Sequence, residues 1–204
     1  EAEVRASLID LVAEQKGRVV VTAFASNLAR ISSIAKAAEA SGRSVVLAGR
    51  SLRRNVEAAR ECGYLEDIPA FLDEDEAGYI PREKLLILCT GCQGEPRGAL
   101  YRVAFHEHKS IGLQAGDTVI FSSKIIPGNE RTIGYVQNRF IYDDIKVITE
   151  KDHFVHVSGH PARDEFADSY SWIRPRVSVP VHGEAPHLSP HSQLPNPPGI
   201  RPAP

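Results

Sequence analysis

The sequence contains no methionine, one tryptophan and only three cysteines among its 204 residues. Cys62, Cys89 and Cys92 are too few and too odd in number for a disulfide framework, so we expect a reducing, cytoplasmic setting. No apolar run approaches the ~18 residues that a membrane-spanning helix requires, and we therefore expect no membrane span. The absent initiator methionine and the acidic start, which does not resemble a signal peptide, indicate a processed or truncated chain.

The sequence also lacks an excess of charge of either sign. It has 24 basic and 26 acidic residues, a formal net charge of -2. This balance argues against a strongly basic nucleic-acid-binding protein, but it leaves room for an enzyme that grips nucleic acid in one local groove. A hydrophobic content of 42% and a charged content of 25% are typical of a folded globular protein. The length predicts one large domain, or one domain with a fragment of another.

Continuous apolar runs alternate with amphipathic segments along most of the chain. We predict strands at 18–24, 44–49, 84–90, 117–123, 146–149 and 176–181, and helices at 1–16, 27–40, 51–63, 97–109, 130–140 and 162–173. Because the strands are apolar throughout, they predict an α/β fold with a mainly parallel sheet and helices on both faces. The tail at 185–204 has seven prolines and is predicted to be a poorly packed loop.

Two polar loops follow predicted strands and could hold a phosphate group. In Phe24-Ala-Ser-Asn27, the Ser26 and Asn27 side chains and the first helical N–H groups suit an anion. An ordinary helix cap by Ser26 or Asn27 is the simpler interpretation of this motif taken alone. The loop Ser122-Ser-Lys-Ile-Ile-Pro-Gly-Asn-Glu130 allows the same two interpretations.

The loop Cys89-Thr-Gly-Cys-Gln-Gly-Glu-Pro96 follows the third predicted strand. Its C-x-x-C spacing suggests zinc or redox chemistry, but a structural zinc site requires four ligands and the sequence offers no second pair. The glycines instead favour a tight turn and close approach to a ligand. Glu95 either orients a histidine or faces solvent.

Histidines are concentrated near the end of the chain. His156-Val-Ser-Gly-His160 combines two imidazoles with a hydroxyl and an accessible backbone, and it favours a functional role in phosphate contact or proton transfer. His182, in Pro180-Val-His-Gly-Glu184, is placed as a zinc ligand would be, with Glu184 beside it. His187 and His191 have the spacing of a helical metal pair, but Pro186 and Pro190 argue against a regular helix there.

Taken in order, five of these motifs resemble the ribonuclease J family, in the β-CASP branch of the metallo-β-lactamase superfamily. They are Phe24–Asn27, Thr90–Pro96, Ile126–Glu130, His156–His160 and Pro180–Glu184. The resemblance extends from about Arg18 to Glu184. It implies a zinc-dependent enzyme that hydrolyses RNA by 5′-to-3′ exonuclease and endonuclease cleavage, with two zinc ions that activate the attacking water.

The resemblance also implies roles for individual residues. Glu95, His160 and His182 match the acidic, first histidine and second histidine motifs of the β-CASP domain. His182 would bind zinc, His160 would protonate the leaving oxygen, and Glu95 would hold His160 in its protonated form. Substrate phosphate would be bound by Ala25, Ser26, Asn27, His156, Val157, Ser158, Gly159 and His160.

The sequence departs from this family in one large respect, because it contains no H-x-H-x-D-H zinc motif. We therefore expect a β-CASP domain at 1–167 and part of a metallo-β-lactamase domain at 168–204, with little or no zinc and no hydrolysis by the chain alone. Its expected partners are RNA and the rest of the metallo-β-lactamase domain, and the full-length protein could form a homodimer.

Two rival interpretations remain open. A non-catalytic α/β module that binds nucleotides or phosphate would explain the Ser, Asn and Gly loops without zinc. Another β-CASP hydrolase, such as an mRNA 3′-end endonuclease or a DNA-repair nuclease, would explain the order of the motifs. The Gln-Gly-Glu-Pro and His-Val-Ser-Gly-His details favour ribonuclease J.

Overall fold

The computed structural model describes residues 1–181, 183–192, 194 and 201–202. The chain divides into two compact units, Glu1–Val157 and Ser158–Pro204. The predicted boundary at residue 167 lies inside helix α6 (Arg163–Ile173) of the second unit.

The larger unit is built on one parallel sheet of five strands, in the order β2-β3-β1-β4-β5. The strands are β1 (Val19–Thr22), β2 (Ser44–Ala48), β3 (Leu85–Cys89), β4 (Thr118–Phe121) and β5 (Lys146–Ile148). Every residue of β1, β3 and β4 is buried, because helices cover both faces of the sheet. The predicted parallel α/β sheet is confirmed.

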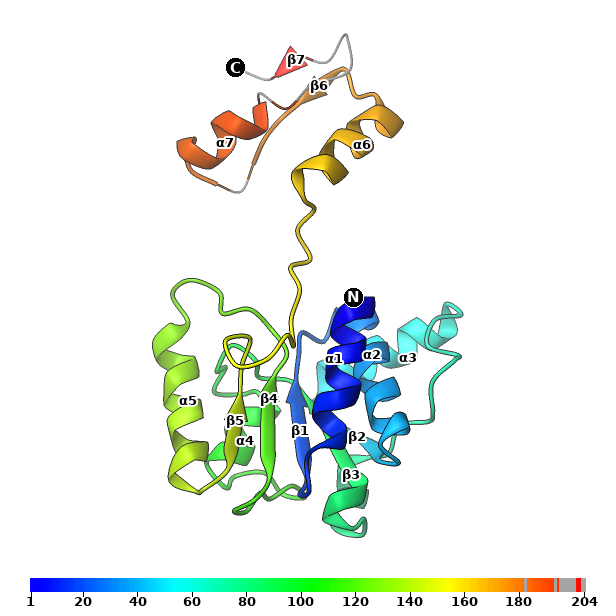
Figure 1. Ribbon diagram of the computed structural model, residues 1–204, viewed down its shortest axis with the longest axis vertical. Coiled ribbons are helices and arrows are strands. Elements are labelled where there is room, and N and C mark those ends of the chain that lie inside the picture. Colours follow the sequence, from blue (N-terminus) through cyan, green and yellow to red (C-terminus); the bar gives the residue numbers. More distant parts are fainter. Residues whose placement is uncertain (182, 193, 195–200, 203–204) are drawn as a thin grey trace. The chain divides into compact units, whose positions relative to one another are not determined.

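Two apolar clusters lie on the two faces of this sheet (Figure 1). One contains buried residues of α1 (Ala2–Ala13), α2 (Leu28–Ala40) and α3 (Arg50–Glu61). The other contains buried residues of α4 (Ala99–Ala104) and α5 (Glu130–Tyr142). Two 3-10 helices, η1 (Glu74–Gly78) and η2 (Arg82–Lys84), lie between α3 and β3 in the chain.

Three predicted elements differ from those observed in this unit. Helix α3 begins at Arg50 behind Gly49, so Ser51 lies in its first turn and is not its cap. Helix α4 covers only part of the predicted 97–109, because His106 adopts a φ of +58° and the N–H groups of Glu107 and His108 turn back to the Arg102 carbonyl. Residues 64–82, for which the sequence pattern predicts neither a helix nor a strand, contain η1, whose Asp73 and Glu76 form a capping box.

The smaller unit contains α6, α7 (Ala185–Ser192) and a two-stranded parallel pair, β6 (Val177–Ser178) with β7 (Arg201–Pro202). The strand predicted at 176–181 is therefore only two residues long in the structure. Tyr170 of α6 hydrogen bonds Ser178 at 2.6 Å and His191 of α7 at 2.8 Å.

The loop prediction for the Pro-rich tail is wrong at its start, where α7 forms. Pro186 is tolerated because it lies in the first turn, where its N–H would have no helical partner. Pro190 removes only one helical hydrogen bond, and the helix ends two residues later at Ser192. Among the residues described, no helix is long and apolar enough to cross a membrane.

Candidate functional site

The sheet has a topological switch point between β1 and β4. The chain leaves β1 toward α2 and β2 on one side of the sheet, and leaves β4 toward α5 and β5 on the other. Ligands of open parallel sheets bind beyond the carboxyl ends of the strands at such a point. The predicted phosphate loops, Phe24–Asn27 and Ser122–Glu130, begin here.

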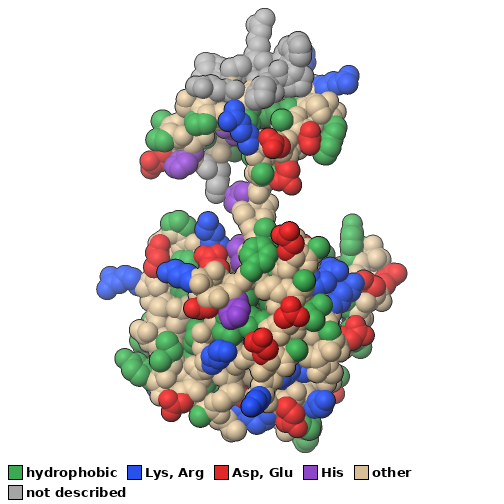
Figure 2. Space-filling view, viewed as in Figure 1, with side chains coloured by type: hydrophobic (Ala, Val, Ile, Leu, Met, Phe, Trp, Pro, Cys, Tyr) green, Lys and Arg blue, Asp and Glu red, His purple; other side chains and the backbone are tan. Residues whose placement is uncertain are grey.

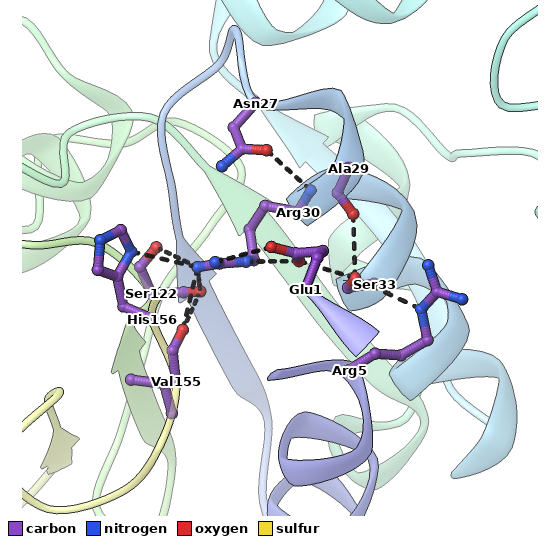
Figure 3. A network of polar contacts seen from close by, with 9 residues as sticks. All are labelled: Glu1, Arg5, Asn27, Ala29, Arg30, Ser33, Ser122, Val155 and His156. Atoms are coloured by element: carbon purple, nitrogen blue, oxygen red, sulfur yellow. Dashed lines mark hydrogen bonds and ion pairs between the residues drawn. The ribbon is translucent and has the colours of Figure 1, made fainter. Parts of the chain in front are cut away.

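Arg30 of α2 lies completely buried behind this switch point (Figure 3). Its Nε and Nη2 donate to the two carboxylate oxygens of Glu1 at 2.8 and 3.0 Å. Its Nη1 reaches Ser122 Oγ at 2.8 Å and the Ser122 and Val155 carbonyls at 3.1 Å each. One guanidinium thus ties α1, α2, the end of β4 and the segment after β5 together.

The charge of Arg30 is balanced inside the protein. Burial acts to raise the pKa of the Glu1 carboxyl, but the hydrogen bonds from Arg30 and Ser33 outweigh it and lower the pKa below its usual value. Glu1 is therefore ionised, and the pair is a bidentate ion pair. Arg30 is a fixed structural group rather than a free ligand for an external anion.

His156 is held against this network. Its Nδ1 lies 3.4 Å from Arg30 Nη1. Burial lowers the pKa of His156, and the Arg30 charge lowers it further. Because a guanidinium can only donate, this contact favours Nδ1 as the acceptor and the tautomer with its proton on Nε2. The half-buried His156 is thus a neutral imidazole with one N–H to offer a ligand.

The loop Ala25–Asn27 is also fixed by contacts with its neighbours. The Asn27 side chain accepts from the Arg30 N–H at 3.0 Å, which confirms Asn27 rather than Ser26 as the cap of α2. The Ala25 carbonyl accepts from Asn55 Nδ2 of α3 at 2.8 Å. Ser26 is exposed. Among the described residues, this leaves the Ser26 hydroxyl, the Asn27 Nδ2 group and the Ala29 N–H to contact an anion.

Gln93 fixes the second wall of the site. Its amide donates to the Lys124 carbonyl at 2.9 Å and accepts from Ile126 N at 2.9 Å and Asn129 Nδ2 at 3.2 Å. The buried Gln93 therefore links the loop after β3 to the loop after β4. Asn129 stands at the N-cap position of α5, but its side chain makes no cap hydrogen bond.

The C-x-x-C motif lies in the core beside this wall. Cys89 and Cys92 are free and buried. Burial raises the pKa of the Cys89 thiol to about 12, and it also raises the pKa of Cys92. Both thiols are therefore protonated at neutral pH, which suits packing rather than metal binding.

The remaining predicted residues are distributed over both units. Glu95 is exposed in the larger unit and its carboxylate accepts from the Gln93 N–H at 3.0 Å. Val157 is the last residue of that unit. Ser158, Gly159 and His160 belong to the smaller unit, where the His160 N–H donates to Ser158 Oγ at 3.1 Å. His182 lies outside the described residues.

Possible zinc ligands are dispersed over the described residues. They contain no group of three or more His, Cys, Asp or Glu side chains able to hold a metal ion. His191, one of the two tail histidines, instead packs on Phe166 at 4.7 Å between ring centroids. The described residues therefore do not form a zinc site by themselves.

Comparison with known proteins agrees with this arrangement. The family model "Ribonuclease J, beta-CASP domain" matches residues 16–140, more than half of the chain. The chain belongs to the ribonuclease J β-CASP family. A second model, "Zn-dependent metallo-hydrolase RNA specificity domain", matches residues 144–195. The resemblance inferred from the five motifs is thus confirmed.

Similar proteins named ribonuclease J occur in several bacteria. The chain is 49% identical to that of Sinorhizobium meliloti over 95% of its own length and 34% of the relative's. It is 41% identical to that of Mycolicibacterium smegmatis over 99% of its length and 36% of the relative's. The Helicobacter pylori protein is 36% identical over 95% of the chain and 28% of the relative. The chain thus spans about a third of these relatives.

Sequence reasoning did not single out Arg30 or Gln93. Arg30 shares a helical face, at i, i+3 and i+7, with the buried Ser33 and Ala37. An arginine on an otherwise apolar or small-residue face is a signal for a buried ion pair, because charged side chains are almost never fully buried alone. Gln93 carries no such signal, since its partners are backbone groups of a distant loop.

Proposed function

We propose that this chain is the RNA-binding β-CASP part of a zinc-dependent ribonuclease. In the full-length protein the enzyme hydrolyses RNA phosphodiester bonds by 5′-to-3′ exonuclease and endonuclease cleavage. The observation that carries this proposal is the neutral His156, fixed by the buried Arg30 beside the Ala25–Asn27 loop at the switch point. The names of the relatives and of the second family model support RNA as the substrate.

The geometry suits a phosphate better than a cation. The start of α2 carries no acidic residue in its first turn, so the positive end of its dipole favours an anion, and among the described residues the Ala29 N–H has no hydrogen-bond partner. His156 Nε2 adds a neutral donor, and Ser26 adds a hydroxyl. Because Arg30 is already neutralised by Glu1, it orients His156 and does not bind the phosphate directly.

The other residues that the sequence predicts to act in the site complete the proposal. Val157, Ser158 and Gly159 would extend the phosphate contacts of His156 through their backbone. His160 would protonate the leaving oxygen, with Glu95 holding its charged form. His182 would contribute one zinc ligand. Since the described residues do not form a metal site, the other ligands would come from outside this chain, and the chain alone would not hydrolyse RNA.

The proposal extends to organisation and setting. The β-CASP domain would occupy 1–167, and 168–204 would belong to a metallo-β-lactamase domain completed by the rest of the protein. Exposed apolar side chains of the smaller unit support such a partner, among them Trp172 at 77% and Ile173 at 73% exposure. Three free cysteines support a cytoplasmic enzyme, and a homodimer of the full-length protein is compatible with this organisation.

Binding of a short RNA by the purified chain tests the phosphate site. A 5′-monophosphorylated dinucleotide should bind, and His156→Ala should weaken it roughly tenfold, since a charge-assisted hydrogen bond is worth about 1.5 kcal/mol or more. His153→Ala is the matched control, because the exposed His153 lies three residues away and only its backbone hydrogen bonds are present. Equal losses for the two variants, or no binding by the wild type, would refute the site.

Cleavage by the full-length protein tests the catalytic roles. His160→Ala should abolish cleavage and leave the zinc content nearly unchanged, because His160 is proposed as a proton donor. Loss of zinc would reassign His160 as a ligand. The isolated chain should show no RNA cleavage, and cleavage by the chain that stops on addition of EDTA would contradict its proposed incompleteness.

A further inference from the structure

A second basic region of the larger unit has no part in the phosphate site described above. A cleft of about 1000 Å³ lies beyond the carboxyl ends of β2 and β3, between the start of α3 and the loop that leads into α4. Four arginines line it: Arg50, Arg54, Arg97 and Arg102. Figure 2 shows basic side chains over α3 on the larger unit.

These arginines are not neutralised by neighbouring carboxylates. Within the described part of the chain, none of the four has a side-chain ion pair or hydrogen bond. The Nε of Arg102 is buried without a hydrogen-bond partner. Glu74 also lines the cleft, but it already accepts from Gly49 N at 3.0 Å and pairs with Arg53 at 3.2 Å. Among the described residues that line the cleft, the exposed Glu107 is the one other carboxylate.

The positions of the arginines on α3 disfavour the folded state. Arg50, Arg53 and Arg54 lie at the beginning of the helix, where its dipole is already positive, and the first turn has no acidic residue. Arg50 and Arg54 are also four residues apart on one helix face, where like charges repel. Gly49 supplies no capping side chain, so the first N–H groups of α3 are unsatisfied as well. A bound anion would relieve all three effects.

The backbone brings this charge close to the Thr90 loop. Gly49 has a φ of +122°, and a Cβ at this position would lie 2.4 Å from Thr90 Oγ1. Gly98 approaches Gly91 so closely that its Cβ would lie 2.7 Å from the Gly91 Cα. Glycine at these positions lets the loop that carries Arg97 fold against the start of α3. The cleft is therefore formed by fixed backbone.

The cleft is connected to the phosphate site. Asn55 lines the cleft and its side chain donates to the Ala25 carbonyl at 2.8 Å. A strand whose phosphate is seated on the Ala25–Asn27 loop would therefore have its next nucleotides beside α3. Arginine suits this position, since its planar donors match phosphate oxygens in pairs.

We propose that Arg50, Arg54, Arg97 and Arg102 form a second binding site for backbone phosphates of a single RNA strand, several nucleotides from the switch-point phosphate. This inference rests on the proposed function for the choice of RNA as ligand. The site would lengthen the bound strand and would contribute affinity without sequence preference.

The test compares two RNA lengths on the full chain by fluorescence anisotropy. The long probe is a 5′-phosphorylated oligouridylate of about 12 nucleotides, within the ~4–16 nucleotide range of single-strand grooves. The short probe is the 5′-phosphorylated dinucleotide. Arg54→Glu and Arg97→Glu should each weaken the long probe roughly tenfold, as expected for a lost charged contact, and leave the short probe unchanged.

Lys16→Glu is the control for the change in charge. Lys16 is exposed before β1, at the opposite end of the strands, and the substitution alters the net charge by the same amount. It should change binding of the long probe little. The salt dependence should also report the site, since each lost phosphate contact lowers the log–log slope by about 0.7 for a single strand.

The outcomes separate this inference from the proposed phosphate site. If the Arg54→Glu variant loses binding of the long probe and keeps binding of the short probe, the inference is supported. Equal binding of the long probe by Arg54→Glu, Lys16→Glu and wild type overturns it, even if the short probe still depends on His156. Loss of the long probe with no short-probe binding in any protein supports the cleft and refutes the switch-point site.

A stability measurement distinguishes a binding role from a structural one. Arg54→Glu should unfold at an equal or higher temperature than the wild type without RNA, because a negative charge near the start of α3 favours the helix dipole. A lower unfolding temperature together with weaker binding would overturn the inference, since damage to the fold would then explain the loss. Inhibition of long-probe binding by pyrophosphate as strong as that by unlabelled RNA would overturn it too, by assigning a small-anion site.

Discussion

Two groups of arginine lie near the same edge of the sheet and differ in burial and in their partners. The first group is Arg30 alone, and the second contains the arginines of the cleft. Arg30 is completely buried, and its guanidinium is in contact with a carboxylate, a hydroxyl and two carbonyls. Arg50, Arg54 and Arg97 are exposed and have no ion pair within the described residues. Arg30 makes its hydrogen bonds within the protein, whereas the guanidinium groups of the second group remain available to a ligand.

This difference assigns two roles: Arg30 orients His156, and the exposed arginines bind RNA phosphates. A buried, neutralised arginine can hold His156 in one tautomer, but it is not accessible to RNA. An exposed and unpaired arginine gives little to the fold and can bind a phosphate directly. We therefore expect substitutions in the first group to change stability strongly, and substitutions in the second group to change mainly affinity.

The largest expected effect is that of Arg30→Ala. The change leaves Glu1, Ser122 Oγ and the Val155 carbonyl without their buried partner, and breaking a buried ion pair costs about 3–5 kcal/mol. Urea unfolding should show this loss of the free energy of unfolding. Arg54→Ala is the contrast and should stay within about 0.5 kcal/mol of wild type, as surface changes do. Similar values for the two variants would remove the distinction between the groups.

Gly49→Ala should produce the next largest effect. Its φ of +122° is strained for any residue with a Cβ, and the added Cβ would lie 2.4 Å from Thr90 Oγ1. We expect a loss of about 1–3 kcal/mol, typical of strained backbone. Gly112→Ala is the control, because a Cβ there meets no atom within 4 Å and no positive φ is recorded. Calorimetric unfolding of both variants measures the difference.

Asn27→Ala tests the helix start that carries the phosphate loop. The change removes the hydrogen bond to the Arg30 N–H and should cost about 1 kcal/mol, as loss of a cap does. Asn27→Asp should retain most of the stability, because a carboxylate caps equally well. It should nevertheless weaken binding of the phosphorylated dinucleotide by charge repulsion. Equal stability of the Ala and Asp variants would contradict the capping role.

The smallest effect concerns pH. Burial and Arg30 lower the pKa of His156, so the unfolded chain takes up this proton at a higher pH than the folded chain. The contribution to stability is therefore full above the unfolded pKa of about 6.5 and is lost as pH falls toward the folded pKa. His156→Gln should lose less stability than wild type below that pH. Parallel pH profiles of the two proteins in urea unfolding would show that His156 does not titrate as proposed.

Apolar runs identified the sheet from sequence because β1, β3 and β4 are buried along their whole length and β2 along most of it. Helix α2 was also predicted to within a residue or two, since Asn27 and Gly42 mark its ends chemically. The two-residue β6 and the helix α7 could not be predicted in the same way. Their short segments have weak periodicity, and Pro186 and Pro190 fall at positions that a helix tolerates.

The candidate site was predicted only at the level of motifs. Their positions after predicted strands marked Ala25–Asn27 and His156 as candidates. Parallel strands bring their carboxyl ends to one edge of the sheet, so residues that follow them lie near that edge. The contacts that fix them depend on Arg30 and Gln93, whose partners are as far as 126 residues away in sequence. Such pairings follow from tertiary packing, and local sequence patterns do not predict them.

The central claim is that Arg30 holds His156 as a neutral donor for an RNA phosphate. Long-range ¹H–¹⁵N NMR of the ¹⁵N-labelled chain near neutral pH tests it directly. We predict that His156 is neutral with its proton on Nε2, and that this nitrogen shifts on addition of the 5′-phosphorylated dinucleotide, while His153 does not. A proton on Nδ1, a doubly protonated ring, or an unchanged His156 signal at saturating RNA would contradict the claim.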